Sequence, residues 1–270
     1  MHITMLLIAT CAHPIKARGI FGLYFSLFTT LATGQAVTPT APTLSPSQVS
    51  QGLQPFSSAA TGAPPAPWHL VGLPKGKAPL AQLDIVALDG APVLRLRTDQ
   101  SYGTLSHALP PDTAAGGLRW RWRLDVPMPA ANLRRKDGDD APLKVCAMFD
   151  LPLSAIPFVE RSLLRLARSV SGEYLPGATL CYVWNHTLPA GTELANAYTR
   201  RVRFVVLDSG SQRLGQWVAH QQDLHADFLR LFGAESDTVP PLLAIVVGAD
   251  SDNTGSTSLG YLGDLSLVKQ

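Results

Sequence analysis

Charged residues are scarce in this sequence and are missing from one long stretch. Lysine, arginine, aspartate and glutamate make up 16% of the 270 residues. Residues 37–67 carry no charge, and no acidic residue precedes Trp68. The formal net charge of +2 comes from Lys16 and Arg18, so the rest of the chain is neutral. A neutral domain lacks the basic face that would neutralise phosphates, so nucleic acid is not an expected partner.

The motifs of several enzyme and metal-site classes are also missing. The sequence has no G-x-S-x-G, no P-loop, no G-x-G-x-x-G and no HExxH or HxH spacing. Of its three cysteines, neither Cys146 nor Cys181 has a cysteine or histidine at metal-ligand spacing. These absences argue against serine hydrolase, nucleotide-binding and zinc-site functions.

The N-terminal residues 1–36 have the pattern of an export signal. Lys16 and Arg18 precede an uncharged, largely apolar run over 19–32, and small residues follow at a cleavage-site position. The run is short for a membrane span, which needs roughly 20 apolar residues. The pattern predicts a signal peptide and an exported protein, either periplasmic or secreted. An uncleaved N-terminus that associates with the membrane or envelope is the alternative.

Residues 37–67 are rich in proline, serine, threonine, alanine and glutamine and show no hydrophobic period. Such a segment buries too little apolar surface to order itself, which predicts a disordered tether. The folded domain is therefore expected to span 68–270.

Hydrophobic periodicity in the domain predicts an all-β fold of about ten strands. Asp89-Gly90 is a strong hairpin signal, and 118–124 alternates apolar residues with three arginines. This alternation places Trp120 and Trp122 on one face, where core packing is expected. The expected strands are 80–88, 92–97, 102–109, 118–124, 144–149, 179–184, 201–207, 216–220, 242–247 and 259–268.

Two amphipathic helices are expected to cover the sheets. One lies over 156–170, and the other lies over 224–232 and ends before Gly233. The apolar face of the first consists of Val159, Leu163, Leu166 and Val170. The predicted fold is a jelly-roll-like β-sandwich, of galactose-binding or concanavalin type, with two short covering helices.

A set of short motifs resembles a known bacterial family. The motifs are Trp120–Arg123, Lys136–Ala141, Leu180–Trp184, Asn196–Val202, Val206–Gly210, Phe228–Gly233 and Asp250–Gly255. Together they resemble DUF3047, a domain of unknown function in exported proteins, over roughly 68–267. The resemblance implies one exported domain and brings no activity, cofactor or catalytic residue.

The two cysteines of the domain leave two interpretations open. Cys146 and Cys181 both lie in expected strands. An exported compartment permits a disulfide between them. Two separate buried thiols are the alternative, since free cysteine is among the most buried residue types.

Two oxygen-rich loops are the candidate ligand site. Residues 136–140 hold three carboxylates, which repel one another unless a cation or an arginine shares the site. Residues 250–254 offer the hard oxygens that calcium prefers, although they lack the glycine and glutamate of an EF-hand loop. Solvated turns are the alternative. The predicted ligand-binding residues are Asp139, Asp140, Asp250, Asp252, Asn253, Tyr198 and Arg201, with Asp250 and Asp252 as calcium ligands.

Tyr198 and Arg201 belong to this set for different reasons. Tyr198 precedes a strand and is the best surface aromatic for stacking on a sugar. Arg201 shares a strand face with Arg203, and both could pair with carboxylates of the acidic loops or form a structural ion-pair network.

These features predict a non-catalytic exported module that binds carbohydrate or cell-envelope glycan. No cofactor other than calcium is expected. One alternative is a glycan-active hydrolase that uses paired aspartates. The other is a structural envelope protein with no small ligand, which a large exposed apolar patch would favour.

Overall fold

A computed structural model of the chain describes residues 52–171 and 174–268. The predicted signal peptide and residues 37–51 of the predicted tether lie outside the described residues.

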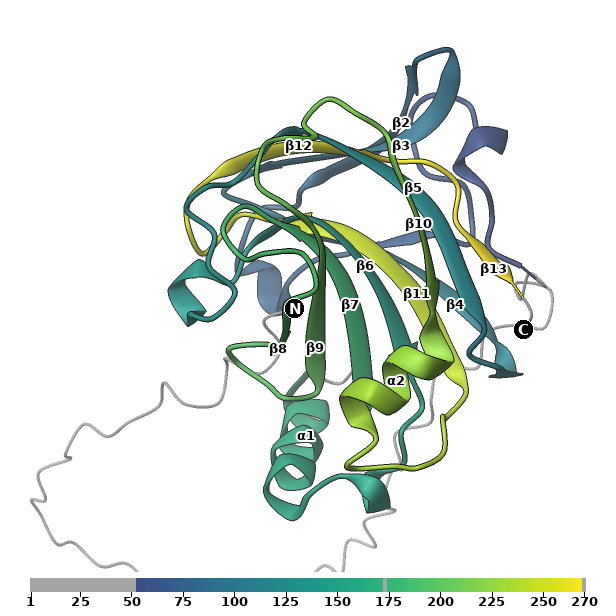
Figure 1. Cartoon of the computed structure of the whole chain (residues 1–270), viewed down its shortest axis with the longest axis vertical. Helices are drawn as coiled ribbons and strands as arrows, with labels where there is room; N and C mark the ends of the chain where they lie inside the picture. The colour runs from purple at the N-terminus through teal and green to yellow at the C-terminus, as the bar shows by residue number, and fades with distance from the viewer. Residues whose placement is uncertain (1–51, 172–173, 269–270) are drawn as a thin grey trace, which may run out of the picture.

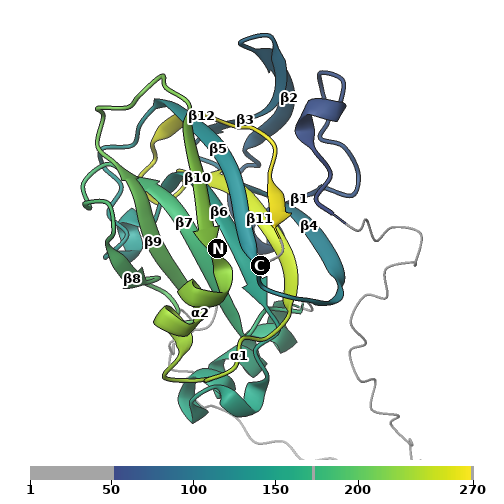
Figure 2. The ribbon, with the colours of Figure 1, turned by 45° about the vertical axis from the view of Figure 1, so that its right-hand side comes forward.

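Within the described residues, thirteen strands form two curled sheets that pack face to face (Figures 1 and 2). The strands are β1 (His69–Val71), β2 (Gln82–Leu88), β3 (Ala91–Asp99), β4 (Tyr102–Thr113), β5 (Gly117–Val126), β6 (Ala141–Phe149), β7 (Ala178–Asn185), β8 (Glu193–Ala195), β9 (Val202–Ser209), β10 (Val218–Asp223), β11 (Leu242–Asp250), β12 (Thr257–Leu262) and β13 (Ser266–Val268). Short 3-10 helices are η3 (Phe56–Ser58), η4 (Pro74–Gly76), η5 (Lys136–Gly138) and η6 (Leu153–Ala155).

The winding of the chain confirms the jelly-roll-like sandwich. The seven-stranded sheet has the order β1-β4-β11-β6-β7-β9-β8, and the other has the order β10-β5-β12-β3-β2, with β13 paired to β5. The chain crosses between the sheets from β3 to β4, from β4 to β5 and from β5 to β6. Only β7 and β9 pair in parallel among the described strands. Asp89 and Gly90, both at positive φ, form the expected hairpin between β2 and β3.

The core lies between the sheets and contains the residues that the strand alternation predicts. Trp120 and Trp122 are buried, and their ring centroids are 5.6 Å apart. Tyr182 and Trp184 of β7 face them from the other sheet and are fully buried. Edge-to-face and tilted aromatic pairs of this kind add stability beyond the area they bury.

The N-terminal boundary of the folded domain differs from the prediction, because residues 52–67 pack on the sandwich. Phe56 is fully buried and lies 5.1 Å from the ring of Trp68. Ser57 donates two hydrogen bonds to Asp264, at 2.9 and 2.5 Å. A single large aromatic and these polar contacts fix a segment whose composition alone predicts disorder. The tether prediction is thereby corrected for 52–67.

Two α-helices lie within the described residues, and one packs as predicted. Helix α2 (Leu224–Phe232) begins at the N-cap Asp223, whose carboxylate accepts hydrogen bonds from two backbone N–H groups. Its residues Leu224, Phe228 and Phe232 are fully buried against the core.

Helix α1 (Phe158–Ser171) packs through a different face from the predicted one. Leu164 and Ala167 are its buried residues, whereas Val159, Leu163 and Leu166 are 68%, 44% and 47% exposed. The hydrophobic periodicity correctly predicted that a helix forms here, but it did not predict which face of the helix packs against the rest of the domain. The described helices are all too short or too polar to cross a membrane.

Candidate functional site

Two oxygen-rich loops meet at one end of the seven-stranded sheet, because β6 and β11 are antiparallel neighbours. The loop before β6 and the loop after β11 therefore lie at the same edge. Asp140 is fully buried and accepts hydrogen bonds from the backbone N–H groups of Asn253 and Thr254, at 3.2 and 2.8 Å. The Ala141 N–H donates to Asp250 Oδ1 at 2.9 Å. The carboxylates of the two loops thus hold each other's backbone.

Lys144 is a buried cation beside these loops that the sequence-based site omits. Its Nζ lies 2.9 Å from Asp250 Oδ2 and 4.6 Å from the centre of the Tyr102 ring. Burial lowers the pKa of Lys144, but the charges of Asp250 and Tyr102 outweigh burial and raise it above its ordinary value. Lys144 is therefore a fixed ammonium. In the sequence, the feature that could have identified Lys144 is that it is the single charged residue of an otherwise apolar strand.

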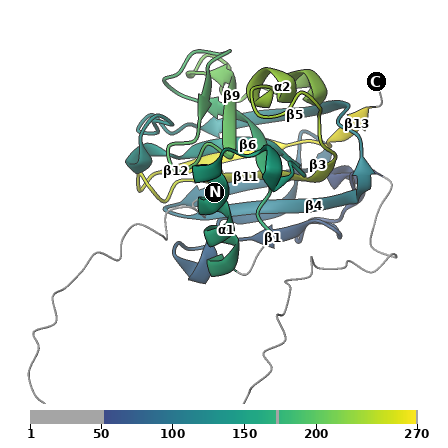
Figure 3. The ribbon, with the colours of Figure 1, turned by 90° about the horizontal axis from the view of Figure 1, so that it is seen from below.

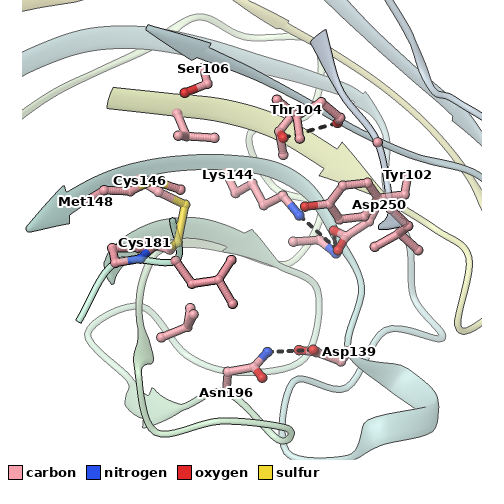
Figure 4. A pocket seen from close by; sticks show the side chains of 18 of the residues that line it. Tyr102, Thr104, Ser106, Asp139, Lys144, Cys146, Met148, Cys181, Asn196 and Asp250 are labelled. Atoms are coloured by element: carbon pink, nitrogen blue, oxygen red, sulfur yellow. Dashed lines mark hydrogen bonds and ion pairs between the residues drawn. A yellow bond between two sulfur atoms is a disulfide. The ribbon is translucent and has the colours of Figure 1, made fainter. Parts of the chain in front are cut away.

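A cavity of about 870 Å³ lies on the face of the seven-stranded sheet that points away from the core. Figure 4 shows Lys144 and Asp250 on one side of it and the two cysteines on another. The polar lining includes Tyr102, Thr104, Asp139, Lys144, Asn196 and Asp250. The apolar lining includes Cys146, Met148, Cys181, Leu175, Phe204 and Val246.

Asn196 is a second polar lining residue that the sequence-based site omits. Its Nδ2 donates to Asp139 Oδ2 at 2.5 Å, as Figure 4 shows, and both side chains are buried. Its Oδ1 accepts the backbone N–H groups of Tyr198 and Thr199, which is an Asx turn. A single asparagine in a loop before a strand has no distinctive sequence pattern. Asn196 is therefore recognised as a site residue only through its contact with Asp139.

Tyr198 joins the loops from outside the cavity. Its hydroxyl donates to the Lys136 carbonyl at 2.5 Å and lies 3.3 Å from Asn253 Oδ1. Burial, then the charges of Asp139 and Asp252, raise the pKa of Tyr198 to about 12, so the phenol stays protonated. The ring faces the Lys136 ammonium at 5.4 Å, so a cation–π contact occupies that side of it.

Arg201 lies away from the cavity. It is 5% exposed and pairs with Glu160 of α1 and with Glu235, which also pairs with Arg203. The structure thus pairs these arginines with glutamates outside the acidic loops. They join α1 to β9 as a structural network.

The cysteines form a disulfide, which decides between the two interpretations. Cys146 on β6 and Cys181 on β7 are directly opposite in the register, with a Cα–Cα distance of 4.0 Å. Both are nearly buried and line the cavity. The disulfide links β6 and β7 at the wall of the cavity.

Asp140, Asp250 and Asp252 form the cluster that could hold a metal ion. One oxygen from each lies within 4.8 Å of the others. Calcium takes six to eight oxygen ligands. Asp140 also binds the Thr254 hydroxyl at 2.6 Å, and Lys144 already supplies a positive charge to Asp250. Calcium binding at Asp250 and Asp252 stays a prediction, and Lys144 counts against it.

The fold and the site define a β-sandwich protein with a lined cavity on the outer face of its larger sheet. The chain belongs to the family described as protein of unknown function (DUF3047), whose model matches residues 66–266. A comparison with curated proteins finds no match in sequence.

Several solved structures have a similar sandwich at low sequence identity. The xyloglucanase domain of NopAA from Sinorhizobium fredii, in complex with cellobiose, has a TM-score of 0.41 at 9% identity and covers 76% of this chain and 99% of its own. The family 11 carbohydrate-binding module of the cellulase Lic26A-Cel5E of Clostridium thermocellum has a TM-score of 0.37 at 10% identity, covering 82% and 96%.

Proposed function

We propose that this protein is a non-catalytic binding protein that takes a saccharide, as the end of a glycan, into the cavity on the seven-stranded sheet. The observation that carries the proposal is the cavity itself, which combines convergent polar groups at one end with an apolar floor. Ligand sites are typically of this size and composition, with a few placed polar groups that fix orientation.

The polar end suits hydroxyl groups. Asp139 and Asp250 are acceptors, while Lys144 and Asn196 are donors, and all four are nearly buried. Each is held by a protein partner, so little side-chain entropy is lost when a ligand binds. The disulfide and Met148 offer an apolar surface to the C–H face of a sugar ring.

The same contacts favour binding over hydrolysis. A glycosidase needs one carboxyl group that transfers a proton and a second that attacks or activates water. Asp250 is bound by an ammonium and an amide, and Asp140 is bound by the second loop. Both carboxylates already accept hydrogen bonds or an ion pair from the protein, which disfavours their use as a proton donor or nucleophile. We extend the proposal to an exported location, as the leader sequence predicts.

Calorimetric titration with saccharides selected on a glycan array tests this function. Ser106→Phe places a ring in the cavity, because Ser106 lines it from β4. Ser266→Phe is the matched control, since Ser266 is exposed on β13. We expect wild-type protein and Ser266→Phe to bind and Ser106→Phe to lose binding. Absence of any saccharide binding by wild-type protein, or equal binding by Ser106→Phe, would overturn the proposal.

A further inference from the structure

The outer face of the six-stranded sheet carries a concentration of arginines. The alternation that buries the tryptophans of β5 places Arg119, Arg121 and Arg123 on the opposite face. On β3, Arg95 and Arg97 point to that same outer face, and β12 lies between β3 and β5. Helices α1 and α2 lie at the lower end of the molecule in Figures 1 and 2, which is the end that Figure 3 views, whereas β3 and β12 lie at its upper end.

A pocket of about 290 Å³ lies on this face where β3 and β12 pair. This arginine pocket is lined by Arg95, Arg97, Asp99, Leu259 and Tyr261, among others. In the register, Leu259 is directly opposite Arg97, and Tyr261 is directly opposite Arg95. The arginine pocket therefore combines guanidinium groups with an apolar and aromatic floor, and it belongs to the sheet that does not carry the larger cavity.

Tyr261 brings a buried hydrogen-bonding group to the arginine pocket. The residue is 9% exposed, and it lies between Arg95 and Arg123 in the register. Its hydroxyl makes no hydrogen bond within the described residues, although tyrosine hydroxyls usually find a partner when they are buried. Burial, then the charge of Asp125, raises the pKa of Tyr261. The phenol therefore stays protonated and can donate a hydrogen bond to a ligand oxygen.

Arg97 supplies a cation to the arginine pocket. It is exposed and forms no ion pair in the part of the chain that the structure describes. Arg95, in contrast, is held by Asp84, whose carboxylate oxygens accept hydrogen bonds from its Nε and Nη2 at 2.9 and 2.6 Å. Asp99 lines the pocket two residues beyond Arg97 on β3. A guanidinium matches a carboxylate through two parallel hydrogen bonds, so Arg97 suits a carboxylate on a ligand.

We infer that the arginine pocket binds a uronate, which is a carboxylate-bearing sugar unit of an acidic polysaccharide. Arg97 pairs with the carboxylate, Tyr261 donates to a neighbouring oxygen, and Leu259 contacts the C–H face of the sugar ring. The cavity on the seven-stranded sheet has the opposite charge, because its lining holds three aspartates and one lysine. The two sites lie on different sheets, so either proposal can fail without the other.

The position of the arginine pocket disfavours an acidic peptide as the occupant. A peptide that binds a β-sheet commonly adds a strand at an exposed edge, where unpaired backbone groups hold it. Strands β3 and β12 are both interior in the order β10-β5-β12-β3-β2, so their backbone groups pair with neighbouring strands. An inorganic anion would leave the apolar floor without a contact. A uronate uses the guanidinium, the hydroxyl and the apolar floor together.

Isothermal titration calorimetry of the full chain with uronate trimers tests the inference. The probes are trimers of galacturonate, glucuronate and mannuronate, each compared with a neutral trimer of the parent hexose. We expect at least one uronate trimer to bind about tenfold tighter than its neutral counterpart, with an affinity that falls as salt is added. Arg97→Gln should weaken this binding about tenfold, because it removes the charged fork. Arg119→Gln is the matched control, since Arg119 is an exposed arginine of the same face outside the pocket.

Three further variants separate this site from other causes of binding. Tyr261→Phe keeps the ring and should weaken binding roughly threefold to tenfold through the lost hydrogen bond. Asp99→Asn removes the lining carboxylate and should strengthen binding, while Ser106→Phe, which fills the other cavity, should leave it unchanged. Equal losses in Arg97→Gln and Arg119→Gln would assign binding to the charge of the whole face and overturn the inference. An unchanged affinity of Tyr261→Phe, no binding of any uronate trimer, or equally tight binding of inorganic phosphate would also overturn it.

Discussion

Lys144 and Asp250 form an ion pair from which nearly all water is excluded. Their side chains are 6% and 5% exposed. Burying two charges is expensive, and their attraction repays it only where further contacts satisfy both groups. The Tyr102 ring and the Ala141 N–H supply those contacts. Removing one partner leaves the other charge buried without compensation.

Lys144→Met should therefore lower the free energy of unfolding by about 3–5 kcal/mol. Adding Asp250→Asn should restore most of the loss, because the amide oxygen still accepts the Ala141 N–H and no buried charge remains. Urea denaturation of both variants and wild type measures this. A loss below about 1 kcal/mol for Lys144→Met would show that the pair is unimportant for stability.

Asp208 makes the stability depend on pH. It is fully buried, hydrogen-bonds Trp122 and His220 at 2.6 and 2.7 Å, and pairs with Arg213. Burial raises the pKa of Asp208, but its hydrogen bonds from His220 and Trp122 and the nearby positive charges outweigh burial and lower it below its ordinary value.

A lowered pKa in the folded state means that this contribution is fully present above the unfolded value, about 4, and is lost as pH falls through the folded pKa. The free energy of unfolding of the wild-type protein should therefore fall as the solution is made acidic. Asp208→Asn should be less stable than wild type at neutral pH, and its free energy of unfolding should fall less between neutral and acidic pH. Denaturant titrations from about pH 7 to about pH 3 measure both slopes. If the free energy of unfolding of the two proteins fell in parallel with pH, Asp208 would be excluded as the source of the acid sensitivity.

At the scale of elements, the disulfide joins neighbouring strands of the larger sheet under the cavity. It closes a loop of 35 residues in sequence separation. Constraint of the unfolded chain by a loop of this length contributes about 3–4 kcal/mol. Cys146→Ala with Cys181→Ala should lose this amount, and reductant should lower the stability of wild type but not of the variant. If reductant left the free energy of unfolding of the wild-type protein unchanged, even when added to the unfolded chain, the prediction would be wrong.

The segment 52–67 acts as a structural element of the sandwich despite its composition. Phe56→Ala should lower the free energy of unfolding by about 3–5 kcal/mol, because it leaves a cavity against Trp68. Ser57→Ala is the control at an adjacent, exposed position and should cost about 1 kcal/mol or less. Denaturant unfolding with limited proteolysis compares them. Equal stability of the two variants would indicate that Phe56 contributes no core packing.

The elements differ in how far the sequence predicts them. Alternation located the strand carrying Trp120 and Trp122 and the face it buries, since a period of two leaves only two choices. Helix α1 was located too, but its packed side was mistaken, because Leu164 and Ala167 on the adjacent face also recur at helical spacing. Phe56 was missed, since one aromatic in a proline-rich run has no periodic signal. Lys144 and Asn196 depend on tertiary contacts that no local pattern encodes.

At the scale of the whole molecule, the two faces of the seven-stranded sheet have different roles. The inner face of the larger sheet completes the core with aromatic side chains, while its outer face carries the cavity. Antiparallel pairing of β6 with β11 brings the two acidic loops to one edge of that cavity. Residues more than a hundred positions apart thus form one polar end, held by Asp140 and its partners from Asn253 and Thr254.

The three carboxylates at this polar end, from Asp140, Asp250 and Asp252, are the kind of oxygen ligands that calcium takes. Thermal unfolding of the whole chain tests whether calcium binds there. A cation bound only to the folded state at a hundredfold excess over its Kd adds about 2.7 kcal/mol, which raises Tm by about 5–10 °C for a domain of this size. We expect a shift well below this on moving from EDTA to millimolar calcium, with magnesium as the control for ionic strength. The reason is that the Lys144 ammonium, 2.9 Å from Asp250, already neutralises the carboxylate that calcium would need. A full calcium-specific shift that Asp252→Asn removes would show that the ion binds beside the ammonium, and the saccharide would then meet a calcium-bearing site.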